Sequence, residues 1–189
     1  MPLSNPAPRE AFHHRSVDYR GYRREDGLWD IEAHLSDTKA YTFDSSFRGT
    51  IEPGEPIHDM WIRLTIDQDF IIQRAEAATD SSPFAICPAV TSSFAKLEGV
   101  ALGRGWSHAV RERLGGVQGC THLVELVRTM ATVAYQAVRG DRDKAAGSSD
   151  TSTAEGKAAL KPLQIDGCHA LSSRGDIVRE QFPEWYTGE

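Results

Sequence analysis

The first half of the chain alternates between apolar and polar residues, which is the pattern of β-strands that bury one face. Four segments carry this pattern: 16–24, 28–37, 57–67 and 70–78. In the clearest of them, Met60, Ile62 and Leu64 share one face, while Asp59 and Arg63 lie on the other. Turn residues rich in Gly, Asp and Pro separate the four segments. We therefore expect an antiparallel meander.

The second half changes to a helical period. Its longest apolar stripe, over 121–139, consists of Leu123, Leu126, Val127, Met130, Ala134, Ala137 and Val138. Such spacing places these residues on one face of a helix, and we expect Gly140 to end it. Shorter helices are expected at 87–97 and 106–114. The sequence thus predicts an α+β fold, with an antiparallel sheet from the N-terminal half and about three helices packed on one face of it.

Composition divides the chain into four parts. Residues 1–12 are expected to be a flexible lead-in, and 13–140 to form the α+β domain. The segment 141–161 is rich in Ala, Gly, Ser and charged residues, so we expect a flexible linker. The last part, 162–189, regains large apolar residues. We expect it to pack back on the domain, or on a partner subunit in a homodimer.

Charge and cysteine content limit the class of protein. The chain has 189 residues, a net charge of -6 and 40% hydrophobic residues, the balance of a soluble globular protein. An acidic chain argues against nucleic acid as a partner, and no apolar run is long enough to span a bilayer. The N-terminus has no signal-peptide pattern. Three distant cysteines argue against a disulfide scaffold, so we expect a cytoplasmic protein without membrane contact.

The candidate catalytic residues are His58, Cys120, His122 and Asp80. His58 faces the apolar side of its strand, where it could act as a base or a ligand. Cys120 directly precedes the long helix, where the helix dipole and free N–H groups favour a thiolate. His122 stands one turn before Glu125, a pair that could orient the imidazole or bind a metal. Asp80 ends a strand and could serve as a general base.

Each candidate also has a structural explanation. His58 could be a hydrogen-bonded core histidine, and Cys120 a small residue that fills a glycine-bounded corner. His122 with Glu125 could be a solvated pair, and Asp80 a turn residue. The sequence alone leaves these alternatives open.

A metal or a small-molecule substrate would involve further residues. A zinc or iron ion is a candidate cofactor, with His58, Cys87 and Cys120 as its ligands. For the substrate we consider Trp61, Trp106 and Arg63. The chain contains no CxxC, HExxH, GxGxxG, Walker or GxSxG motif, so the standard zinc, nucleotide and serine-hydrolase sites are not expected.

The chain resembles a bacterial family catalogued as a domain of unknown function. The resemblance is dense over 14–138 and returns at 163–188. Its segments include Gly21 to Glu32, Asp37-Thr38-Lys39, Pro56-Ile57-His58, Ala78-Thr79-Asp80, Pro83 to Cys87 and Gly119 to Leu123. Members of that family are often encoded among genes for the breakdown of aromatic or other small molecules. The resemblance therefore implies a role in catabolism.

Over about half of its length, the chain is also similar to the U-type iron–sulfur cluster scaffold proteins. The strand Ile62 to Asp67 resembles a strand of those proteins, and Cys87 lies near their second ligand. Cys120 resembles the third ligand region, and His58 stands where the first cysteine belongs. This resemblance implies a metal-binding or cluster-handling module.

Three functions follow as hypotheses. The first is a small catabolic enzyme, of lyase or hydrolase type, that acts through His58, Cys120 and His122 on a small organic metabolite, with aromatic compounds among the candidates. The second is a metal-binding module on the same residues. The third is a non-catalytic interaction subunit. Bound zinc or iron in the purified protein would separate the second from a metal-free first.

Overall fold

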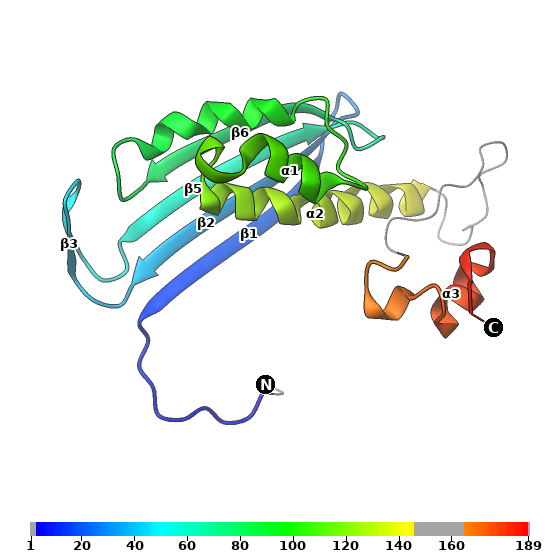
Figure 1. Ribbon diagram of the computed structural model, residues 1–189, viewed down its shortest axis with the longest axis horizontal. Coiled ribbons are helices and arrows are strands. Elements are labelled where there is room, and N and C mark those ends of the chain that lie inside the picture. Colours follow the sequence, from blue (N-terminus) through cyan, green and yellow to red (C-terminus); the bar gives the residue numbers. More distant parts are fainter. Residues whose placement is uncertain (1–2, 146–164, 189) are drawn as a thin grey trace. The chain divides into compact units, whose positions relative to one another are not determined.

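The computed structural model describes residues 3–145 and 165–188. Four long strands form an antiparallel sheet in the order β1-β2-β5-β6 (Figure 1). Their bounds are β1 His13–Arg23, β2 Trp29–Lys39, β5 Pro56–Ile66 and β6 Ile72–Ser81. These strands occupy the four segments where the apolar and polar residues alternate. The expected sheet is therefore confirmed.

A small second sheet lies in the connection between β2 and β5. It consists of β3, Phe43–Ser45, paired antiparallel with β4, Gly49–Ile51. Arg48 ties this hairpin to the start of β5 by donating from Nη1 to the carbonyl of Pro56, at 2.6 Å. The connection therefore meets the strand at the end of the sheet where β5 begins.

Helical segments cover one face of the large sheet (Figure 1). They are η1 Cys87–Leu97, α1 Trp106–Leu114, η2 Gly116–Gln118 and α2 Thr121–Ala145. The structure thus confirms an α+β fold with about three main helices. The segment 87–97 has 3₁₀ geometry rather than α geometry. The expectation that Gly140 ends the longest helix was wrong, because α2 continues to Ala145.

The core lies between the sheet and these helices. Its buried side chains include Ile31, Ala33, Leu35, Met60, Ile62, Leu64, Leu123, Leu126, Val127 and Met130. Gly21 allows α2 to approach β1 closely, because a Cβ there would lie 2.7 Å from the Cβ of Ala137. The apolar stripe of α2 and the inward face of the strands thus form one continuous core.

The chain divides into two compact units, 1–141 and 142–189. The described part of the second contains η3 His169–Leu171, α3 Asp176–Gln181 and η4 Pro183–Trp185, with Ile165 and Val178 buried. The segment expected to be a linker, 141–161, begins inside α2 and continues beyond the described residues. The expectation that 162–189 packs back on the domain or on a partner stays a prediction. In the described parts of the chain, no helix is both long and apolar enough to cross a membrane.

Candidate functional site

The inward face of the sheet changes from apolar to polar at one end. On β2 the inward residues end with Leu35 and then Asp37. Strand pairing sets Asp37 opposite Arg15 of β1 on one side and opposite His58 of β5 on the other. Three polar side chains from three adjacent strands therefore lie next to one another. They stand at the end of the sheet where β2 ends and β5 begins (Figure 1).

Asp37 is the centre of this polar group. It is a buried carboxylate, with 2% of its side chain exposed. Arg15 donates to both of its oxygens, from Nε to Oδ1 at 2.7 Å and from Nη2 to Oδ2 at 2.8 Å. His13 Nε2 lies 3.2 Å from Oδ1, and His58 Nδ1 lies 3.0 Å from Oδ2. A buried charge needs such partners to offset its lost hydration.

These partners keep Asp37 ionised. Burial by itself would raise the pKa of the carboxyl group. The hydrogen bonds and the positive charge of Arg15, followed by His58, outweigh burial and hold the pKa of Asp37 below its ordinary value. The site therefore contains a fixed negative charge over the whole physiological range of pH.

The start of α2 adds two more groups to the site. His122 Nε2 lies 3.8 Å from Asp37 Oδ2, and the ring centroids of His58 and His122 are 3.9 Å apart. The Sγ of Cys120 lies 3.9 Å from His122 Nδ1 and 4.0 Å from the Sδ of Met60. His58, Cys120 and His122 therefore lie together. We refer to Asp37, His58, Cys120 and His122 as the polar cluster.

Both imidazoles of the polar cluster favour the neutral form. Burial lowers the pKa of His58, and the positive charges of Arg15 and His13 add to this, although Asp37 opposes it. Burial also lowers the pKa of His122, together with the nearby His58 and Arg15. A neutral imidazole offers a free nitrogen lone pair, which is the form that binds metal or accepts a proton.

Three residues of the cluster have the arrangement of metal ligands. Asp37, His58 and His122 each offer one ligand atom, and these atoms all lie within 4.8 Å of one another. Zinc bonds to nitrogen and oxygen are about 2.0–2.2 Å long, so ligands of one ion lie a few Å apart. Two histidines and one carboxylate also form a known ligand set for iron. In the described part of the chain, these three residues are the one group of His, Cys, Asp or Glu side chains whose ligand atoms lie close enough together to bind a single ion.

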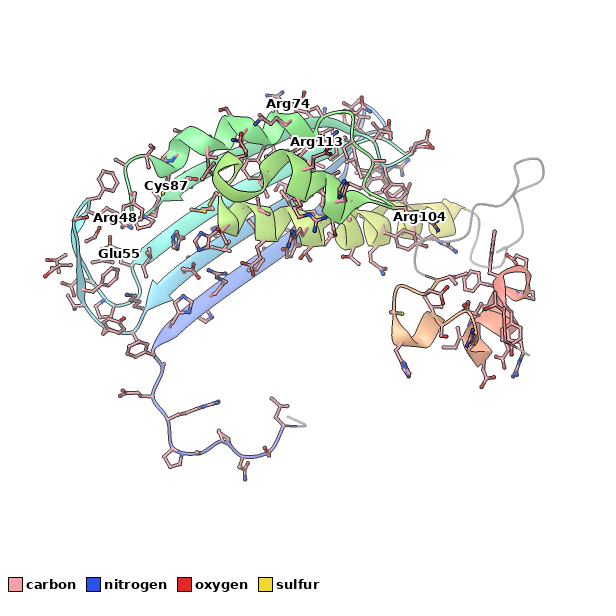
Figure 2. The ribbon with its side chains drawn as sticks, viewed as in Figure 1. Arg48, Glu55, Arg74, Cys87, Arg104 and Arg113 are labelled. Carbon is pink, nitrogen blue, oxygen red and sulfur yellow. The ribbon has the colours of Figure 1, made fainter. Side chains whose placement is uncertain are left out.

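Cys87 and Asp80 are not part of that group. Cys87 is a half-buried free thiol at the start of η1, at the end of the sheet where β6 finishes (Figure 2). Asp80 is exposed on β6. Both residues belong to the segment in which the chain leaves β6 at the polar end of the sheet. Their predicted roles stay predictions.

The residues considered for the substrate lie elsewhere. Trp61 is on the outward face of the sheet, where its ring stacks on His34 with a centroid distance of 3.8 Å. Arg63 is on the same face and pairs with Glu32. Trp106 is buried in the core, and its indole N–H donates to the carbonyl of Val127 at 3.2 Å. The structure does not bring these three residues to the polar cluster.

Asp37, Arg15 and His13 were missed in the sequence. A signal for Asp37 exists, because it continues the alternation of Trp29, Ile31, Ala33 and Leu35 on the buried face of β2. A charged residue at the next inward position of a strand needs a partner. Arg15 and His13 lie in a strand whose residues are almost all exposed, so their direction follows only from the pairing with β2.

Comparison with known proteins identifies the family of the chain. Residues 13–136 match the family described as protein of unknown function (DUF2889). The chain belongs to this family. The matched segment contains the large sheet and the whole polar cluster, so the cluster lies in the DUF2889 domain itself. No curated protein and no solved structure matches the chain. The resemblance to iron–sulfur scaffold proteins therefore gains no support from these comparisons.

Proposed function

We propose that this DUF2889 protein is a metal-dependent enzyme of small-molecule catabolism, of lyase or hydrolase type. Asp37, His58 and His122 would hold one zinc or iron ion. One observation carries the proposal: the three ligand atoms lie within 4.8 Å of one another on three different elements, β2, β5 and α2. The substrate would be a small organic molecule, with aromatic metabolites among the candidates.

The charge of the site supports a divalent cation. Asp37 is ionised, and both histidines favour the neutral form. Arg15 adds a positive charge, but its Nη1 is 2.8 Å from Oε2 of Glu125, so a second carboxylate offsets it. Because a carboxylate has about four lone-pair positions, Asp37 can keep Arg15 while it binds an ion. Arg15 then acts as a positioning residue that fixes the carboxylate.

Three protein ligands leave coordination positions open, which is typical of catalytic rather than structural metal sites. A divalent ion there supplies Lewis-acid chemistry, by polarising a carbonyl oxygen or by lowering the pKa of water. The side chains of His58 and His122 are 16% and 24% exposed, so a small molecule can reach them. Cys120, beside His122, would act as a further ligand or as an acid toward the substrate.

A metal titration tests this proposal. Purified full-length protein, stripped with a chelator, is titrated with Zn²⁺ or, without oxygen, with Fe²⁺, and its melting temperature is followed. A free metal concentration of 100 times the Kd stabilises the folded protein by about 2.7 kcal/mol. This raises the melting temperature by roughly 5–10 °C. His58→Gln and His122→Gln should lose the rise. His14→Gln, exposed on β1, should keep it. A rise of equal size in all three variants would contradict the proposal.

Metal-free thiol chemistry is the second candidate function. Cys120 Sγ, His122 and Asp37 follow one another at 3.9 Å and 3.8 Å, in the order thiol, imidazole, carboxylate. A nucleophile beside a base that a third group orients is the general arrangement of covalent catalysis. An activity that survives metal removal but is lost in Cys120→Ser would favour this function.

A further inference from the structure

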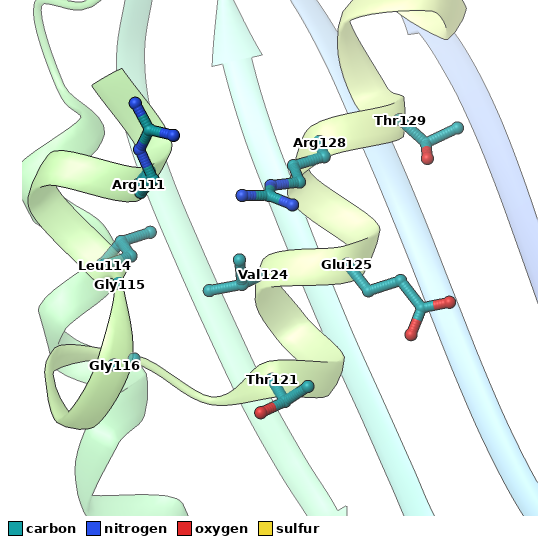
Figure 3. A pocket seen from close by; sticks show the side chains of 10 residues that line it. Arg111, Leu114, Gly115, Gly116, Thr121, Val124, Glu125, Arg128 and Thr129 are labelled. Carbon is teal, nitrogen blue, oxygen red and sulfur yellow. The ribbon is translucent and has the colours of Figure 1, made fainter. Parts of the chain in front are cut away.

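A groove separates α1 from α2 on the outer side of the helical layer (Figure 3). Its volume is about 570 Å³, within the range of small-molecule sites. Arg111 and Leu114 line it from α1, and Val124, Glu125 and Arg128 line it from α2. The groove contains none of the three residues proposed to hold a metal. It is therefore a separate feature of the domain.

The groove carries positive charge in an acidic protein. Arg111 and Arg128 are exposed and line the groove from the two helices; in Figure 3 the side chain of Arg128 reaches into the space between them, and that of Arg111 runs along the edge of α1. The Nη2 of Arg111 lies 3.3 Å from His108 Nδ1, and Arg128 has no ion pair with any described residue. Glu125 extends away from the space between the two helices (Figure 3) and pairs with Arg15. Two guanidinium groups thus face one groove without a carboxylate of their own.

The loop at one end of the groove is built from glycines. Gly115, Gly116 and Gly119 line it. A Cβ at Gly115 would collide with the carbonyl oxygen of Arg111, and a Cβ at Gly119 with that of Leu114. Only glycine allows this close path of the backbone. At these three positions no side chain fills the end of the groove, which Thr121 also lines.

From these features we infer that the groove binds an amphipathic organic carboxylate. The guanidinium groups of Arg111 and Arg128 suit a carboxylate, because they can donate two parallel hydrogen bonds to it. Half-buried Val124 and the edge of the buried Leu114 each lie about one helical turn from an arginine, and they offer an apolar wall for the carbon skeleton of the ligand. An inorganic anion would use the arginines alone, whereas the proposed ligand uses the wall as well.

The test uses benzoate as the probe, benzamide as its neutral counterpart and inorganic phosphate as an anion without an apolar part. Binding to the full-length protein is followed by calorimetry and by NMR shifts of the α1 and α2 amides. Benzoate should bind more tightly than phosphate, and benzamide should not bind. Arg111→Gln and Arg128→Gln should each weaken benzoate binding about tenfold, the effect of one lost charged hydrogen bond. Arg113→Gln, on α1 but outside the groove, should have no effect.

Four results would overturn the inference. The first three are no benzoate binding at millimolar concentration, equal binding of benzoate and benzamide, and unchanged benzoate binding in both groove variants. Binding of phosphate alone would also overturn it, because the apolar wall would then have no part. Both arginines are exposed, so the variants should fold, and their melting temperatures check this. Benzoate bound to a metal at the polar cluster would not respond to the arginine variants, so these variants separate the two sites.

Discussion

His58 Nδ1 lies 3.0 Å from Oδ2 of the buried Asp37. The two residues are also direct neighbours across β2 and β5. This contact fixes which face the imidazole presents to the start of α2, where His122 lies with its ring centroid 3.9 Å from that of His58. The sheet thus positions the imidazole of His58, and the start of α2 places the imidazole of His122 next to it.

Replacing Asp37 by Asn should lower the free energy of unfolding by about 2–3 kcal/mol. The change keeps the shape but removes the negative charge that Arg15 and His58 contact. Leaving a charged donor without its partner at a buried site costs about this much. Urea denaturation measures the loss. Asp18→Asn, at an exposed pair on β1, is the control. Equal stability of the two variants would show that Asp37 is not the anchor of the cluster.

The protein should lose stability as the pH falls below about 6.5. His58 and His122 have lowered pKa values in the folded protein, so the unfolded chain takes up protons first. The stability that the neutral imidazoles contribute is therefore complete above the ordinary histidine pKa. It is lost as the pH falls through the folded pKa values. Stability decreases further as the pH falls below the ordinary pKa of an aspartate, because folding also lowers the pKa of Asp37.

The groups that face these imidazoles set the size of this effect. Asp37 and Glu125 favour the protonated forms, whereas Arg15 and His13 oppose them. Denaturant unfolding at a series of pH values, with a chelator present, measures the slope. In a His58→Gln/His122→Gln variant the slope between pH 6.5 and the acid limb near Asp37 should become shallower. An unchanged slope would assign the effect to other groups.

Zinc should protect Cys120 from alkylation. Its sulfur lies 3.9 Å from His122, so an ion on His122 would bind the thiol or restrict access to it. Mass spectrometry after iodoacetamide treatment gives the rate for each cysteine. Cys168 is exposed and serves as the internal control, because its rate should not change with zinc. Equal alkylation rates at Cys120 with zinc and with chelator would show that this thiol is not part of the proposed metal site.

Two glycine substitutions should have opposite effects on stability. Gly21→Ala should destabilise by about 1–3 kcal/mol, because its Cβ would lie 2.7 Å from that of Ala137. Gly140→Ala should stabilise by about 1 kcal/mol, because Gly140 is exposed inside α2 with open space around it. Thermal unfolding of the two variants measures both changes. A loss of stability in Gly140→Ala would mean that the helix does not pass through this residue.

Much of the fold follows from local patterns. The period of two in 57–67 predicts both a strand and the inward direction of His58, and the structure has this residue facing the core side beside Met60. The apolar stripe after Cys120 predicts α2 and sets His122 at its start. These features depend on the geometry of single elements, which the sequence displays directly.

The centre of the site could not be predicted in this way. Arg15 meets Asp37 only because β1 and β2 pair in one particular register, and a shift by one residue would turn Arg15 to the opposite face. The continuation of α2 past Gly140 has a similar cause. A glycine costs about 1 kcal/mol in a helix, and neighbouring contacts such as that of Val138 in the core can offset this amount.

The metal content of the protein tests the central proposal most directly. Full-length protein is purified without oxygen and without added metal, and its zinc and iron are measured by mass spectrometry. We predict about one zinc or iron per chain, the stoichiometry of a single three-ligand site. His58→Gln and His122→Gln should lose it, and His14→Gln should retain it. A wild-type protein that contains neither metal and takes up neither from solution would contradict the proposed metal site.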